Sequence, residues 1–147
     1  MYVLTGGGTS TAPFTSSTLL VAAPDVAFFD QFGAALAWVD FNGDGIDDLL
    51  VGAPAYDIGE DCMGGLLGEG RVVLRKSNVP VATYFIDDPD PNPACHAGLS
   101  YPDGWGAALA SGKLDNNAKM DLVIGNPRAT DGGSLTNAGK IRVVMYH

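Results

Sequence analysis

Residues 32–54, FGAALAWVDFNGDGIDDLLVGAP, align without a gap to residues 105–127, WGAALASGKLDNNAKMDLVIGNP. Nine of the 23 aligned positions are identical, and they include the GAALA run, an Asp-Leu pair and a Gly-x-Pro ending. Residues 70–74, GRVVL, and residues 139–144, GKIRVV, extend the similarity further along each copy. Self-similarity at a fixed spacing is the signature of a repeat architecture, so we interpret the chain as a repeat protein.

The placement of glycine and proline restricts the fold class. The chain has 147 residues with 20 glycines and 9 prolines, and the longest stretch free of both, residues 113–124, has only twelve residues. The interior of that stretch reads LDNNAK, which is typical of a turn rather than of a helix. Because helices of ordinary length have no room to form, we predict an all-β fold.

Each copy reads as a series of short strands separated by turn residues. Apolar runs predict two strands in the N-terminal piece, four in the first copy and three in the second. Strands in this order form small antiparallel meanders, the arrangement of β-propeller blades. The strands with predicted bounds are Tyr2–Leu4, Thr18–Ala22, Ala34–Val39, Asp48–Gly52, Arg71–Arg75 and Val81–Ile86.

We therefore expect a single domain, residues 1–147, that forms a partial propeller of about two and a half blades. Residues 1–31 form a half blade, residues 32–104 a full four-stranded blade, and residues 105–147 three strands of a further blade. Propellers usually have about four to eight blades. We expect either a fragment of a longer propeller or copies that join through blade–blade contacts into a ring or fibre.

The loop between the first two strands of the first copy carries the chemistry. Residues 40–48 read DFNGDGIDD, with oxygen-bearing side chains at positions 1, 3, 5 and 9 and a glycine at position 6. Ca²⁺ takes about six to eight oxygen ligands, and a loop that curls around the ion can supply them. We predict a Ca²⁺ site whose ligands are the side chains of Asp40, Asn42, Asp44 and Asp48 and the carbonyl of Ile46.

A hairpin turn without metal uses the same Asn-Gly and Asp-Gly pairs. Three carboxylates held about 5 Å apart repel one another by roughly 3 kcal/mol per pair at an effective dielectric constant of about 20. A plain turn gives no compensation for that repulsion, which favours the cation site. The loop is not an EF-hand, because its twelfth position is Val51 rather than a bidentate Glu and no helix flanks it.

The matching loop of the second copy has lost most of these ligands. Its corresponding residues are Lys113, Asp115, Asn117, Ala118, Lys119 and Asp121. Only two carboxylates remain, and the ammonium of Lys113 is a candidate to neutralise them in place of a cation. We predict one good calcium site in the chain rather than two.

The order Phe32-Gly33, then DFNGDGIDD, then Gly52-Ala53-Pro54 resembles FG-GAP repeats, the blades of the integrin α-subunit propeller. The resemblance implies that calcium binds in the loop joining the first two strands of a blade. In this chain it would be held by the five ligands given above. It also implies that the FG and GAP positions pack the fold; these are Phe32, Trp105, Pro54 and Pro127. The function it implies is a calcium-stabilised module for extracellular adhesion or for binding a protein or glycan, with structural calcium.

Two cysteines bear on the compartment. In a four-stranded meander successive turns alternate ends, so Cys62 and Cys95 lie at the same end, opposite the calcium loop. A disulfide between them would contribute about 3 kcal/mol and would indicate an oxidising compartment. Two free thiols are the alternative. With the family resemblance, this leads us to expect an extracellular or cell-surface protein.

Several classes of function are excluded by composition. The net charge is −9, from 17 acidic against 8 basic residues, which argues against nucleic acid as a partner. No apolar run approaches the roughly 20 residues of a membrane span. Cys95 and His96 are adjacent and rarely face each other, and the acids at 87, 88 and 90 lie in a proline-rich loop, so we predict no enzymatic activity. A non-catalytic region of a secreted enzyme stays open, and the ligand is not identified.

Overall fold

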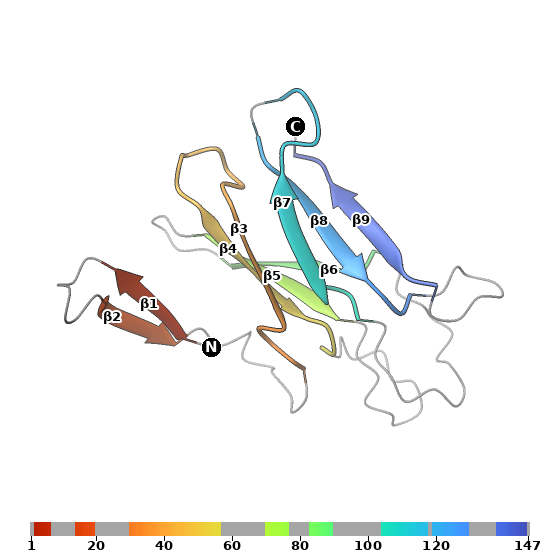
Figure 1. Ribbon diagram of the computed structural model, residues 1–147, viewed down its shortest axis with the longest axis horizontal. Helices are drawn as coiled ribbons and strands as arrows, with labels where there is room; N and C mark the ends of the chain where they lie inside the picture. Colours follow the sequence, from red (N-terminus) through yellow and green to blue (C-terminus); the bar gives the residue numbers. More distant parts are fainter. Residues whose placement is uncertain are drawn as a thin grey trace.

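The structure, a computed structural model, describes residues 2–6, 14–19, 30–56, 70–76, 83–89, 104–117, 119–129 and 138–146, with side chains from residue 30 onward. Within these ranges the chain forms antiparallel sheets of two, four and three strands and contains no helix (Figure 1). The predicted all-β class and the predicted grouping of strands are therefore confirmed. The described ranges therefore include no helix that could cross a bilayer.

The first sheet is a hairpin of β1 (Tyr2–Gly6) and β2 (Phe14–Leu19). The prediction of its second strand at 18–22 was wrong, because β2 begins four residues earlier, at Phe14. The cause is the register: Leu19 lies opposite Tyr2 and Phe14 opposite Gly6, so pairing with β1 rather than the apolar run defines the strand. Residues 20–22 lie outside the described residues.

The second sheet is a meander in which each strand pairs with the next. It contains β3 (Ala35–Val39), β4 (Asp48–Ala53), β5 (Arg71–Arg75) and β6 (Thr83–Asp87). Every residue of β4 is buried, as expected for an apolar strand covered on both faces. The predicted bounds are correct to one residue for β3 to β5, whereas β6 begins at Thr83 rather than Val81.

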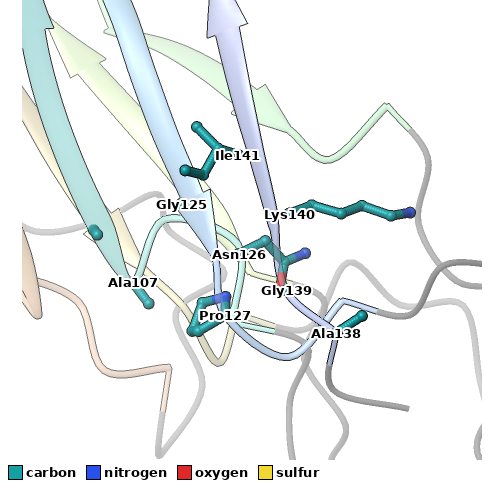
Figure 2. A pocket seen from close by; sticks show the side chains of 9 residues that line it. Ala107, Gly125, Asn126, Pro127, Ala138, Gly139, Lys140 and Ile141 are labelled. Atoms are coloured by element: carbon teal, nitrogen blue, oxygen red, sulfur yellow. The ribbon is translucent and has the colours of Figure 1, made fainter. Parts of the chain in front are cut away.

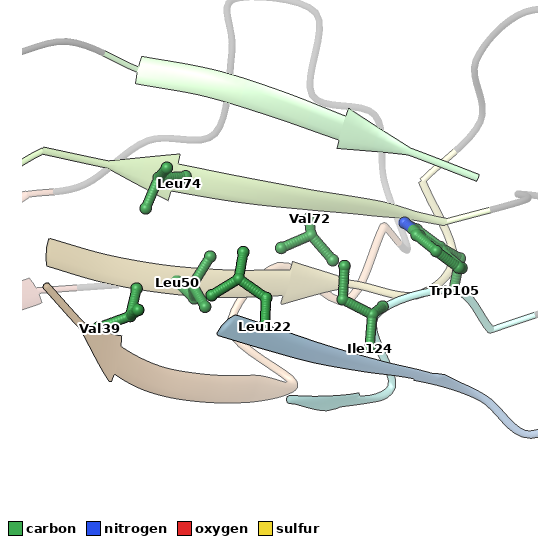
Figure 3. Close-up of a cluster of buried hydrophobic side chains, with 7 residues drawn as sticks. All are labelled: Val39, Leu50, Val72, Leu74, Trp105, Leu122 and Ile124. Atoms are coloured by element: carbon green, nitrogen blue, oxygen red, sulfur yellow. The ribbon is translucent and has the colours of Figure 1, made fainter. Parts of the chain in front are cut away.

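The third sheet repeats the same meander with three strands, β7 (Ala108–Gly112), β8 (Asp121–Asn126) and β9 (Lys140–Val144). It packs against the second sheet, with β7 beside β3. The core lies between them, since alternate residues of each strand face the partner sheet. Figure 3 shows the buried cluster, which consists of Val39, Leu50, Val72, Leu74, Trp105, Leu122 and Ile124.

Trp105 joins the two sheets. It is only 2% exposed, and its indole N–H donates to the carbonyl of Ile86 at 2.8 Å. Its backbone forms a parallel bridge with Gly70. Pro54 is buried and Phe32 packs against a smaller cluster on the other face of the second sheet, but Pro127 is exposed. Three of the four expected packing residues are thus found in contact with the interior.

Two polar contacts add to the packing of the second sheet. The guanidinium of Arg71 forms a bidentate pair with Asp87, at 2.6 and 3.0 Å, and lies over the rings of Tyr56 and Phe85, 4.1 and 4.6 Å from their centroids. The amide of Asn126, which is 1% exposed, donates to Asp88 at 3.1 Å and so ties β8 to the end of β6. Asn126 occupies the position of the alanine in the first copy.

Candidate functional site

The loop between β3 and β4 is closed by hydrogen bonds from its backbone to its own side chains. The Asp40 carboxylate accepts two, from the N–H of Asp44 at 3.0 Å and from the N–H of Gly45 at 2.9 Å. The Asn42 side-chain oxygen accepts from the same Asp44 N–H at 2.9 Å, and Asp44 Oδ1 accepts from the N–H of Ile46 at 2.9 Å. Three oxygen-bearing side chains are thus turned toward the backbone of one tight loop.

Two glycines make this loop conformation accessible. Gly43 has a φ of 75° and Gly45 a φ of 84°, both in the left-handed region that favours glycine. Nothing lies within 4 Å of the position that a Cβ would take on either residue. Backbone conformation rather than crowding therefore requires glycine at both positions.

The remaining predicted ligands lie at the end of the loop. Asp48 begins β4, opposite Val39, and is 0% exposed. Ile46 is 52% exposed, and its N–H donates to Asp44 Oδ1. The loop thus combines one carboxylate fixed in the sheet with others on a short exposed segment.

The donor set fits a hard cation. Oxygen atoms are the ligands that Ca²⁺ prefers, and a carboxylate has about four lone-pair sites, so an oxygen that accepts an N–H keeps capacity for a metal. Over the described ranges, however, no three Asp, Glu, His or Cys side chains converge into a metal cluster. The ligands predicted at Asp40, Asn42, Asp44, Ile46 and Asp48 lie on one loop, and their binding of calcium stays a prediction.

The loop between β7 and β8 satisfies its acids differently. Asp121 is 0% exposed, and its carboxylate accepts from the N–H of Leu114 at 2.8 Å and from the N–H of Tyr146 at 3.2 Å. The Asp115 carboxylate accepts from the backbone and side-chain amides of Asn117, at 2.9 and 2.8 Å. Lys113 is exposed, and the predicted contact of its ammonium with these acids stays a prediction.

Tyr146 links the two loops, which lie at the same end of the sheets (Figure 1). Its ring centroid is 4.8 Å from that of Phe41, and the Lys119 ammonium lies over the same ring at 4.1 Å. Its carbonyl accepts from the Asn117 side chain at 2.8 Å. Sequence reasoning missed this residue because it stands after the last strand, outside the repeated motif, and nothing local marks it.

Comparison with known proteins places this geometry in a family. Residues 32–74, which span the FG turn, the β3–β4 loop and the strands up to β5, match the FG-GAP repeat family. This chain is an FG-GAP repeat protein. The resemblance inferred from the sequence is confirmed, and the FG-GAP chain is also similar to integrin alpha proteins.

Relatives of two kinds match the FG-GAP chain. Phosphatidylinositol-glycan-specific phospholipase D from Rattus norvegicus is 36% identical over 70% of the chain, which covers 11% of that protein. Integrin alpha pat-2 from Caenorhabditis briggsae is 30% identical over 74% of the chain, and integrin alpha-5 from Xenopus laevis 31% over 65%; the chain covers 8% of each. The FG-GAP chain therefore spans about a tenth of the length of these relatives.

Proposed function

We propose that this FG-GAP chain is a calcium-binding β-propeller module that works outside the cell in adhesion, or in binding a protein or glycan. The β3–β4 loop carries the proposal, because it places the four predicted side-chain ligands within nine residues. Three of these side chains are already oriented by hydrogen bonds to the loop backbone. Orientation before binding lowers the entropy cost of taking up the ion.

The proposed role of calcium is structural. Asp40, Asn42, Asp44, the Ile46 carbonyl and Asp48 would hold the ion, whose charge offsets repulsion among the carboxylates. The loop connects β3, which contacts β7, to β4, which is buried along its whole length. Fixing this loop therefore stabilises the interface between the two sheets.

Removing one carboxylate tests the calcium site. Asp44→Ala should abolish most of the calcium dependence of the melting temperature, because Asp44 contributes a ligand and also accepts the Ile46 N–H that shapes the loop. A ligand at about 100 times its Kd stabilises a fold by about 2.7 kcal/mol, or about 5–10 °C for a chain of this size. Thermal unfolding by circular dichroism, in millimolar Ca²⁺ and in chelator, measures the difference.

Asp47→Ala is the matched control. It removes a carboxylate from the same exposed loop at a position outside the predicted ligand set. It should keep the calcium-dependent shift that Asp44→Ala loses. Equal responses of the wild type and Asp44→Ala to chelator would reject the site, and so would the absence of any calcium-dependent shift in the wild type.

The extracellular setting and the ligand class rest on similarity. The integrin alpha matches support a role in adhesion or recognition, and the acidic chain, with a net charge of −9, suits a protein that works among divalent cations. The proposed Cys62–Cys95 disulfide belongs to the same picture, although both cysteines lie outside the described residues. We infer that the chain itself is not catalytic, since FG-GAP repeats are structural units.

The phospholipase D matches favour a second candidate, an accessory non-catalytic region of a secreted enzyme. The similarity to the Rattus norvegicus enzyme covers 70% of this chain but only 11% of that protein. An assay of phosphatidylinositol-glycan cleavage, with the whole rat enzyme as positive control, tests the non-catalytic assignment that both candidates share. We expect no cleavage by the isolated chain, and measurable turnover would overturn the non-catalytic assignment.

A further inference from the structure

The outer face of the third sheet, which points away from the second sheet, is apolar and open. The strand register places Ala108, Ala110, Val123, Gly125, Ile141 and Val143 on this face. Ile141 is 76% exposed and Val143 is 45% exposed. None of these six positions carries a charged side chain.

The same positions in the second sheet are buried. Counted through the repeat, Val123, Ile141 and Val143 correspond to three side chains of the central core, and these are Leu50, Val72 and Leu74. They are 0%, 0% and 1% exposed because the third sheet covers them. We refer to the face formed by these equivalent positions as the socket. The socket of the second sheet is covered by the third sheet, whereas the socket of the third sheet is open.

The segment that fills the first socket is the Trp105–Gly106 turn. A Cβ on Gly52 would overlap the carbonyl of Gly106, and one on Gly70 would overlap the backbone of Trp105. A Cβ on Gly106 would in turn lie 2.9 Å from Cγ2 of Val72. Two glycines in the socket and one in the turn therefore allow this close approach of backbones.

The open socket keeps the corresponding glycines, Gly125 and Gly139, beside an empty hollow. The hollow has a volume of about 630 Å³ and is lined mainly by apolar atoms (Figure 2). Its walls include Ala108, Pro127 and Ile141 as well as both glycines. A Cβ on Gly125 would meet only Ala108 of its own sheet, at 3.1 Å and beyond. At position 52 the crowding comes from the neighbouring sheet, whereas at position 125 no neighbouring sheet comes within 4 Å of the added Cβ.

The opposite face of the second sheet presents the counterpart, which we refer to as the plug. Phe32 occupies the position of Trp105, and Leu36 that of Leu109. Leu109 packs against the core between the sheets, whereas Leu36 is 52% exposed. Trp38 and Phe85, on the same face by register, are 55% and 45% exposed. The chain therefore carries an open socket on one sheet and a partly open plug on the other.

We propose that the open socket binds the Phe32–Gly33 turn and the Leu36 face of a second copy of this chain. The contact continues the interface that the chain already forms between its own two sheets, with the same residue positions on each side. Because socket and plug are different surfaces, the contact is heterologous and adds copies head to tail, into a ring if the rotation closes and a filament if it does not. The proposal goes beyond the calcium-binding module and does not depend on it.

Sedimentation velocity of the full chain across a range of concentrations tests the proposal. The wild type should form species larger than one chain, and Ile141→Glu should weaken the association at least about a hundredfold, because it buries an unpaired charge in an apolar contact. Val143→Glu serves as a second socket variant if the first fails to fold by circular dichroism. Leu114→Glu, at a 53% exposed position on neither face, is the control that should associate like the wild type.

Mixing distinguishes a head-to-tail contact from any other association. Ile141→Glu disrupts the socket and leaves the plug intact, whereas Leu36→Glu disrupts the plug and leaves the socket intact. Each variant alone should therefore be monomeric. An equimolar mixture should form dimers, because one intact plug and one intact socket remain. A monomeric wild type up to about millimolar concentration would overturn the proposal. Assembly of Ile141→Glu alone, or no dimer in the mixture, would also overturn it.

Discussion

Gly52→Ala should be strongly destabilising, although it adds only one methyl group to a residue in a regular strand. The new Cβ would overlap the carbonyl oxygen of Gly106 and would lie 3.4 Å from Cβ of Ala35. The obstructing atom belongs to the backbone, so no side-chain rotation relieves the overlap. Gly106 is also held in place, since its N–H donates to the Gly125 carbonyl at 3.2 Å.

The magnitude follows from the cost of overpacking. Extra methylenes in a close-packed site cost about 1–3 kcal/mol, and a backbone shift belongs at the upper end of that range. Alanine also lowers the conformational entropy of the unfolded chain, which stabilises the folded state by about 0.4–1 kcal/mol and offsets part of that cost. We expect a net loss of about 2 kcal/mol, or about 4–8 °C in melting temperature, measured by urea and thermal unfolding at low protein concentration.

Gly125→Ala is the matched substitution, since Gly125 occupies the same position of the second copy. Its Cβ would meet only Ala108, with the methyl carbon at 3.1 Å and the carbonyl oxygen at 3.6 Å, so a shift of a few tenths of an ångström relieves the contact. We expect a change within about 0.5 kcal/mol of zero. Equal losses for the two variants would refute the reasoning, because they would show that strand glycines matter here for conformation and not for the approach of the next sheet.

Two further substitutions test contacts around the second sheet. Trp105→Phe should cost about 1–3 kcal/mol by urea unfolding, because the Ile86 carbonyl loses its donor while the aromatic packing largely remains; a change below about 0.5 kcal/mol would show that water replaces the indole. Arg71→Lys should cost about 1–2 kcal/mol, because an ammonium cannot form the bidentate pair with Asp87 and stack on two rings at once. If Asp87→Asn removes the same free energy from the wild type as from the Arg71→Lys variant in a double-mutant cycle, the bidentate pair is not the source of that difference.

The sequence predicted the elements whose signal is local. The bounds of β3, β4 and β5 followed from apolar runs that end at glycine or at the acidic loop, and the loop itself followed from the spacing of its oxygen-bearing residues. The grouping of strands followed from the internal repeat. In each case the residues that decide the structure are close together in the chain.

The sequence did not predict features that depend on contacts between distant segments. The bounds of β2 come from its register with β1, which the run at 18–22 does not encode. The hydrogen bond from the N–H of Tyr146 to the carboxylate of Asp121 joins residues 25 positions apart, which the sequence of the loop does not encode. The predicted contact of the Lys113 ammonium with the acids of this loop stays a prediction.

The contact between Phe41 and Tyr146 has a consequence for synthesis of the chain. The two rings are separated by about 100 residues, and ribosomes add about 5–20 residues per second. During translation the acidic loop is therefore made about 5–20 seconds before its aromatic neighbour exists. Over that interval the nascent loop lacks its contact with Tyr146, which forms only after β9 and Tyr146 have been synthesised.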